Sequence, residues 1–165
     1  MIGMKKTPIE NRNMADGGVV ALVRPPIVYV VAIVAGLGIE TGWPTPPLPS
    51  VLAPLGVVLV LLAVTLYALS IRELRAARTT FRTQRPTTTM VMTGPYRLSR
   101  NPIYLAFTLL QLGIGLWWNS AWVLGLLVQA FVLVSFGTVA REERYLQEKF
   151  GDEYRRYKAD VPRWL

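Results

Sequence analysis

The sequence predicts an all-α membrane protein with about four transmembrane helices, of which the last two form a tight helical hairpin, and a cytoplasmic amphipathic C-terminal helix. Hydrophobic residues make up 52% of the chain and charged residues only 17%, and clustering of the charges leaves long uncharged runs that suit a bilayer. All 18 lysines and arginines lie in three segments, 1–24, 72–100 and 141–165. With 165 residues, the chain is expected to form a single membrane domain, residues 1–165. Because basic segments of membrane proteins face the cytoplasm, we expect both termini to be cytoplasmic.

The composition also excludes several kinds of site. The chain has no cysteine, which excludes disulfides, thiolate nucleophiles and cysteine-ligated metals. It has no histidine, which excludes an imidazole base and a histidine-ligated metal, so we expect no metal site. A formal net charge of +8 would suit nucleic-acid binding, but runs of bilayer-spanning length separate the basic segments. We therefore expect a membrane, and no nucleic acid, as the partner of the basic residues.

The N-terminal half contains two expected spans within residues 25–71. Residues 1–24 are polar and mixed in charge and lack the basic-then-apolar order of a cleavable signal, so we expect a cytoplasmic segment there. The first span covers about residues 25–43, with its prolines in the first helical turn, where a missing N–H costs nothing. Four prolines within 43–50 predict a stiff turn, and the second span follows at about 51–71.

The two later basic segments are expected in the cytoplasm. Residues 72–100 are rich in threonine and predict a loop, which either contacts anionic lipid headgroups or also covers a ligand. In residues 141–165, apolar side chains recur at steps of three and four, the pattern of an amphipathic helix. This helix is expected to lie on the membrane surface or to pack on the 72–100 loop, with a break at Gly151.

Residues 101–140 predict the helical hairpin, because forty residues without a charge suffice for two spans. Three tryptophans surround Asn119-Ser120 at the midpoint. Tryptophans favour the membrane interface and Asn-Ser favours a turn. Gln111 and Gln129 are expected at similar depth on facing helices, hydrogen-bonded to each other. The small residues that would permit close helix contact are Gly113, Gly115, Ala121 and Gly125.

Polar residues gather where the hairpin begins, in the run Arg100-Asn101-Pro102-Ile103-Tyr104. Proline keeps Asn101 extended and starts the helix at Pro102, so free backbone N–H groups there could bind a carboxylate or phosphate. The alternative is simple punctuation of a membrane helix, with Arg100 as an anchor that reaches the interface.

A pair of carboxylates, Glu142-Glu143, lies where the hairpin ends. Closure of the hairpin would bring them beside the start of its first helix, where they could hold a cationic group or a ribose. The alternative is a salt bridge to Arg100, Arg141 or Arg144.

Short motifs follow one another in the second half of the chain: Thr93-Gly94-Pro95-Tyr96-Arg97, Arg100-Asn101-Pro102-Ile103-Tyr104, Glu142-Glu143, Phe150-Gly151-Asp152-Glu153-Tyr154, Tyr157 and Val161-Pro162-Arg163. Their order resembles the isoprenylcysteine carboxyl methyltransferase and phospholipid methyltransferase family, whose members are integral membrane enzymes that use S-adenosylmethionine. The resemblance covers about residues 80–165.

The resemblance implies where S-adenosylmethionine would bind and S-adenosylhomocysteine would form. In the family, an Arg-His-Pro-x-Tyr motif lines the cofactor; here Asn101 replaces the histidine, and it can donate a hydrogen bond but cannot titrate. Glu142 matches the glutamate that closes the site. The implied cofactor-binding residues are Thr89, Met90, Val91, Tyr96, Arg100, Asn101, Pro102, Ile103, Tyr104, Glu142 and Glu143.

We expect methyl transfer to a lipophilic or lipid-linked acceptor. The alternatives are methylation of a phospholipid amine, or a non-catalytic membrane homologue or assembly subunit. Displacement from a sulfonium depends on alignment and needs no metal, whereas an amine must first lose a proton to Glu142, Glu143, a tyrosine or water. Prenylcysteine enzymes carry an arginine one turn before the glutamate, near Thr138 here, so a prenylcysteine carboxylate is not expected unless Arg141 substitutes. The expected catalytic residues are Glu142 and Arg141.

Overall fold

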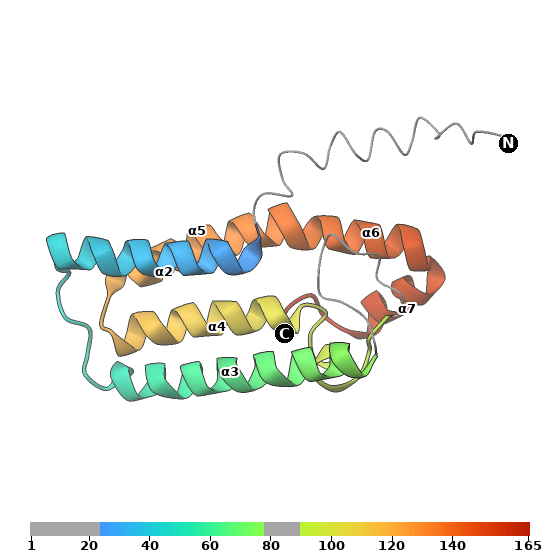
Figure 1. Ribbon diagram of the computed structural model, residues 1–165, viewed down its shortest axis with the longest axis horizontal. Coiled ribbons are helices and arrows are strands. Elements are labelled where there is room, and N and C mark those ends of the chain that lie inside the picture. The colour runs from blue at the N-terminus through green and yellow to red at the C-terminus, as the bar shows by residue number, and fades with distance from the viewer. Residues whose placement is uncertain (1–23, 78–89) are drawn as a thin grey trace, which may run out of the picture.

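The computed structural model describes residues 24–77 and 90–165, and every regular element within them is helical. The elements are α2 (Pro25–Gly42), α3 (Leu52–Ala76), the 3-10 helix η1 (Gly94–Arg97), α4 (Pro102–Trp117), α5 (Ala121–Leu133), the π-helix η2 (Val134–Val139), α6 (Ala140–Phe150) and α7 (Asp152–Asp160). In Figure 1, α2 lies beside α5 and α3 beside α4, and α6 continues from α5 past the end of the bundle. The expected all-α membrane protein is confirmed.

Within the described residues, three helices are long and apolar enough to cross a membrane: Pro25–Gly42, Leu52–Ala76 and the continuous helix Ala121–Phe150. The helix α4 is apolar but has 16 residues, a length of about 24 Å. Large apolar side chains point outward from the bundle, such as Val34 at 64% exposure and Leu61 at 62%. A helix that is apolar on its outer face as well as its inner face is suited to lipid.

The bundle contacts depend on glycines in facing helices. A Cβ atom added to Gly56 of α3 would lie 2.6 Å from the carbonyl oxygen of Gly113 in α4, and one added to Gly113 would lie 2.7 Å from the carbonyl oxygen of Gly56. A Cβ at Gly115 would lie 2.5 Å from a side-chain atom of Leu124, whereas a Cβ at Gly125 would meet nothing within 4 Å. The expectation of close contact is therefore correct for Gly113 and Gly115 and wrong for Gly125.

Gly56→Ala is expected to destabilise the protein, because backbone atoms of α4 cannot move aside as a flexible side chain could. The thermal midpoint in detergent should fall by several degrees, which corresponds to a loss of about 1–3 kcal/mol. Gly125→Ala is the matched control and should melt like the wild type. Equal midpoints for the two variants would contradict the tight α3–α4 contact.

Hydrogen bonds join the two connections at the end of the bundle opposite α6. The Glu40 carboxylate accepts hydrogen bonds from the Thr45 backbone N–H at 2.6 Å and from the Ser120 hydroxyl at 2.7 Å. The Leu48 backbone N–H donates to Asn119 Oδ1 at 2.7 Å. The proline-rich turn and the turn of the hairpin therefore hold each other in place.

Three details differ from the sequence-based expectations. The helix α3 continues to Ala76, into the segment expected to be a loop, since the residues after Ile71 are good helix formers. Gln111 donates to the Val123 carbonyl oxygen and Gln129 is exposed, so the expected pairing of the two glutamines is wrong. The second arm of the hairpin does not end near residue 140 but runs on as one helix to Phe150. The break at Gly151, with φ of 53°, is confirmed.

Residues 1–23 of the expected N-terminal segment and residues 78–89 of the expected 72–100 loop, which include Thr89, lie outside the described residues.

Candidate functional site

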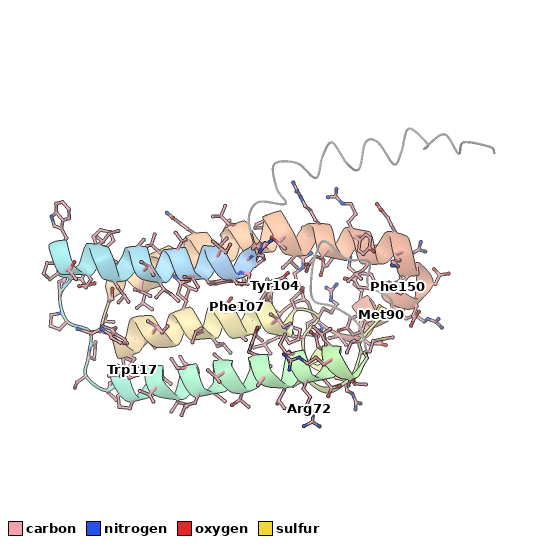
Figure 2. The ribbon with its side chains drawn as sticks, viewed as in Figure 1. Arg72, Met90, Tyr104, Phe107, Trp117 and Phe150 are labelled. Carbon is pink, nitrogen blue, oxygen red and sulfur yellow. The ribbon has the colours of Figure 1, made fainter. Side chains whose placement is uncertain are left out.

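The start of α4, the start of α6 and the C-terminal residues 161–164 meet at one end of the bundle. Figure 2 shows Tyr104 at this end and Trp117 at the opposite one. Pro102 occupies the first turn of α4, and Asn101 before it is extended, with φ of −129°. The local sequence therefore starts the helix where the resemblance places the cofactor motif.

Tyr104 and Glu142 form the direct polar contact between α4 and α6. The Tyr104 hydroxyl donates to Glu142 Oε1 at 2.8 Å. Tyr104 is 2% exposed and belongs to the apolar cluster of the bundle, while Glu142 is half-buried. Glu142 Oε2 accepts no hydrogen bond from a described residue. One carboxylate oxygen at this end is thus fixed, and the other is available to a ligand.

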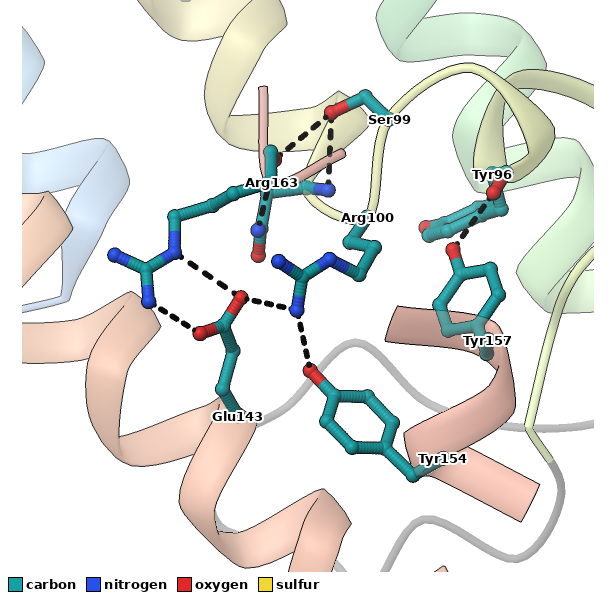
Figure 3. Close-up of polar contacts among 8 residues, drawn as sticks. Tyr96, Ser99, Arg100, Glu143, Tyr154, Tyr157 and Arg163 are labelled. Carbon is teal, nitrogen blue, oxygen red and sulfur yellow. Dashed lines mark hydrogen bonds and ion pairs between the residues drawn. The ribbon is translucent and has the colours of Figure 1, made fainter. Parts of the chain in front are cut away.

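Glu143 lies between two guanidinium groups, as Figure 3 shows. Its Oε1 is 2.8 Å from Arg100 Nη1, and Arg163 contacts both carboxylate oxygens. The Arg100 and Glu143 side chains are each 8% exposed, and the Tyr154 hydroxyl accepts a hydrogen bond from Arg100 at 3.4 Å. The salt-bridge alternative therefore describes Glu143, with Arg100 and Arg163 as the partners.

Asn101 contacts the C-terminal segment. Its Nδ2 donates to the Arg163 carbonyl oxygen at 3.1 Å, and the Ser99 hydroxyl donates to the same oxygen at 3.2 Å. The Asn101 side chain does not cap α4. In this structure the amide that replaces the family's histidine holds the C-terminal segment.

The π-helix η2 sets the direction of both glutamates. A π turn contains an additional residue relative to an α turn, and such turns are frequent at functional sites. One added residue rotates the following helix by about 100°, so without η2 Glu142 and Glu143 would face other partners. Inside η2 the Ser135 hydroxyl is buried without a hydrogen-bond partner among the described residues.

The other residues implied by the resemblance occupy different positions. Pro102 and Ile103 are buried in the first turn of α4, and Met90 packs against the cluster of Tyr154, Tyr157 and Val161. Val91 is half-buried. Tyr96 is 9% exposed, and its carbonyl oxygen accepts a hydrogen bond from the Tyr157 hydroxyl at 2.6 Å. Arg141 is exposed and makes no ion pair with a described residue.

Tyr96 of η1 and Tyr157, which donates a hydrogen bond to the Tyr96 carbonyl oxygen, are unsuited to act as bases. Burial, above all, raises the pKa of Tyr96 and of Tyr157 beyond the ordinary value of a tyrosine. Both hydroxyls therefore remain protonated near neutral pH. Since Glu143 is held by two guanidinium groups, Glu142 is the remaining candidate base among the residues that meet here.

Sequence reasoning did not identify Ser99, Tyr154 and Arg163 as members of this cluster. Tyr154 was recognisable only as part of the apolar stripe of the C-terminal helix. Arg163 was recognisable only as the last residue of a family-like motif. Its contacts depend on the return of the chain after α7, which no local pattern predicts.

Comparison with known proteins gives one family and two relatives. A family model described as phospholipid methyltransferase matches residues 51–153. An uncharacterised protein of Haemophilus influenzae is 49% identical over 65 residues, which are 38% of this chain and 100% of that protein. The cobalt-zinc-cadmium resistance protein CzcN of Cupriavidus metallidurans is 38% identical over 82 residues, 48% of this chain but only 38% of CzcN. No solved structure matches the chain.

Proposed function

The chain belongs to the phospholipid methyltransferase family, and from this premise we propose that it moves a methyl group from S-adenosylmethionine to a lipophilic or lipid-linked acceptor at the membrane surface. The observation that carries the proposal is the Tyr104–Glu142 hydrogen bond at the mouth of the α4–α5 hairpin. It joins the Arg-Asn-Pro-Ile-Tyr motif to Glu142, two parts of the family pattern that lie far apart in the sequence. A non-catalytic homologue is the less favoured reading, because these two residues are both present and in contact.

The polar groups at this end of the bundle are of the kinds that can bind S-adenosylmethionine. Glu142 Oε2 could accept a hydrogen bond from a ribose hydroxyl or an ammonium group, and Arg100 Nε is buried without a partner among the described residues. Tyr104 would hold Glu142 in orientation. When bound, the cofactor supplies an activated methyl group on a sulfonium, so the protein has mainly to align the acceptor and exclude water.

The acceptor would arrive laterally from the bilayer, since the helices beside this end are apolar on their outer faces. If it is a phospholipid amine, Glu142 would take the proton that the amine must lose. A prenylcysteine carboxylate would need a paired cation. Both arginines of the cluster already pair with Glu143, and Arg141 is exposed. These contacts favour a neutral or amine-bearing lipophile.

Titration calorimetry of the purified protein in detergent with S-adenosylhomocysteine tests the proposal. We expect saturable binding to the wild type and binding at least about tenfold weaker to Glu142→Gln, the loss of one hydrogen bond to a charged group. Arg144→Ala, an exposed change on the same helix, is the control. A folded wild type that releases no heat would defeat the proposal.

We also propose that the site faces the cytoplasm, together with both chain termini, because all 18 basic residues then lie on one side. Reporter fusions at residues 46 and 119 should give the non-cytoplasmic signal, and a fusion at residue 165 the cytoplasmic one. The same signal at 119 and at 165 would contradict the proposed orientation.

A further inference from the structure

The C-terminal residues 161–164 contact the residues that lead into α4, Glu143 of α6 and the apolar cluster that contains Tyr104. The Arg100 backbone N–H donates to the Pro162 carbonyl oxygen at 3.0 Å. The Arg163 carbonyl oxygen accepts from Ser99 and Asn101, and its guanidinium group contacts Glu143. The centroids of the Trp164 and Phe131 rings are 4.9 Å apart, and Trp164 packs against the apolar cluster that contains Tyr104. We call these residues the C-terminal latch.

The C-terminal latch joins the start of α4 to the start of α6. A ligand at Glu142 would leave these contacts intact. A ligand would bind Glu142 at Oε2, beside the hydrogen bond that Oε1 accepts from Tyr104. The contacts of Arg163 to Asn101 and Glu143 lie on neighbouring residues and do not involve Glu142. They can therefore keep α4 and α6 together when Glu142 also accepts a hydrogen bond from a ligand.

Arg163 also bears on the rotation of α6, because it shares the Glu143 carboxylate with Arg100. Glu142 and Glu143 are consecutive, so their side chains point about 100° apart around the helix. Two-point contact between the Arg163 guanidinium and the Glu143 carboxylate fixes one of these directions. With the Glu143 side chain held in this way, the Glu142 side chain points toward Tyr104.

We propose that Arg163 is a positioning residue of the methyl-transfer site: through Glu143 it sets the direction of Glu142, and through its carbonyl oxygen it holds the start of α4. This inference rests on the proposed function. Arg163 touches neither a reacting atom nor Glu142, and the side chain is 37% exposed. Its removal leaves Arg100 paired with Glu143, so a variant at this position should fold.

The test is S-adenosylhomocysteine binding to the full-length protein in detergent, by calorimetry. Arg163→Gln should bind at least about tenfold more weakly than the wild type while melting within a few degrees of it. The affinity of Arg163→Lys should lie between those of the wild type and Arg163→Gln, because an ammonium group keeps the charge but cannot make the two-point contact.

A double-mutant cycle with Glu142→Gln separates positioning from general support of the fold. If Arg163 acts by directing Glu142, Arg163→Gln should cost less affinity in the Glu142→Gln background than in the wild type. A purely structural residue would cost the same in both.

Wild-type affinity in Arg163→Gln, or equal costs in the two backgrounds, would overturn the positioning role alone. Failure of the wild type itself to bind would instead overturn the proposed function, and the positioning role with it.

Discussion

Glu143→Ala is expected to lower the free energy of unfolding by about 3–5 kcal/mol, the loss typical when one partner of a buried ion pair is removed. The Arg100 side chain is 8% exposed, and the variant would leave its charge without a carboxylate among the described residues. Arg163 would remain beside it. The two guanidinium groups now share one carboxylate and would repel each other in its absence.

Denaturant or thermal unfolding in detergent measures this loss. Glu148→Ala, an exposed change on the same helix without an ion pair to a described residue, is the matched control. Glu143→Gln should lie between the two, because the amide keeps a hydrogen-bond acceptor for one guanidinium group. A Glu143→Ala protein as stable as the control would show that the cluster does not support the fold.

The helices could be predicted from the sequence because a bilayer demands long uncharged runs with basic flanks. The starts at Pro25 and Pro102 follow from proline chemistry, and the break at Gly151 follows from the ease with which glycine adopts a positive φ. The extension of α3 to Ala76 was missed because hydropathy marks where a membrane span ends and not where a helix ends.

Which helices touch could not be predicted in the same way. In lipid, apolar faces look alike, and the choice of partner depends on close backbone approach. Gly56 and Gly113 meet across α3 and α4, while Gly125, an equally plausible glycine, meets nothing. Gln111 likewise donates to the Val123 carbonyl oxygen and not to Gln129.

The meeting of the two ends of the hairpin was predictable, and the pairings of the side chains there were not. Hairpin closure brings Tyr104 and Glu142 together, as the spacing implied. The separate tasks of Glu142 and Glu143 depend on the π-helix Val134–Val139, which shifts the helical register, and on the return of Arg163. Neither feature has a local sequence signal.

Glu142→Gln is expected to lower methyl transfer to an amine acceptor by about 10²-fold or more, the usual effect of removing a general base. The amide keeps the shape of the side chain and can still accept from Tyr104, so the fold should survive. The amide cannot take up a proton, and no other group in the cluster replaces it. Tyr96 and Tyr157 stay protonated because burial raises the pKa of each hydroxyl, and two guanidinium groups hold Glu143.

The size of this effect reports the class of acceptor. Assays with a radiolabelled methyl donor should compare phosphatidylethanolamine, lipid extracts from the native host and a farnesylated cysteine, for the wild type, Glu142→Gln and the exposed control Arg144→Ala. A carboxylate acceptor loses no proton, so Glu142→Gln should slow its methylation only through weaker cofactor binding. Full activity of Glu142→Gln on an amine would exclude Glu142 as the base. Robust turnover of the farnesylated cysteine would show instead that an arginine can hold the substrate carboxylate. Arg141, which makes no ion pair with a described residue, would be the candidate.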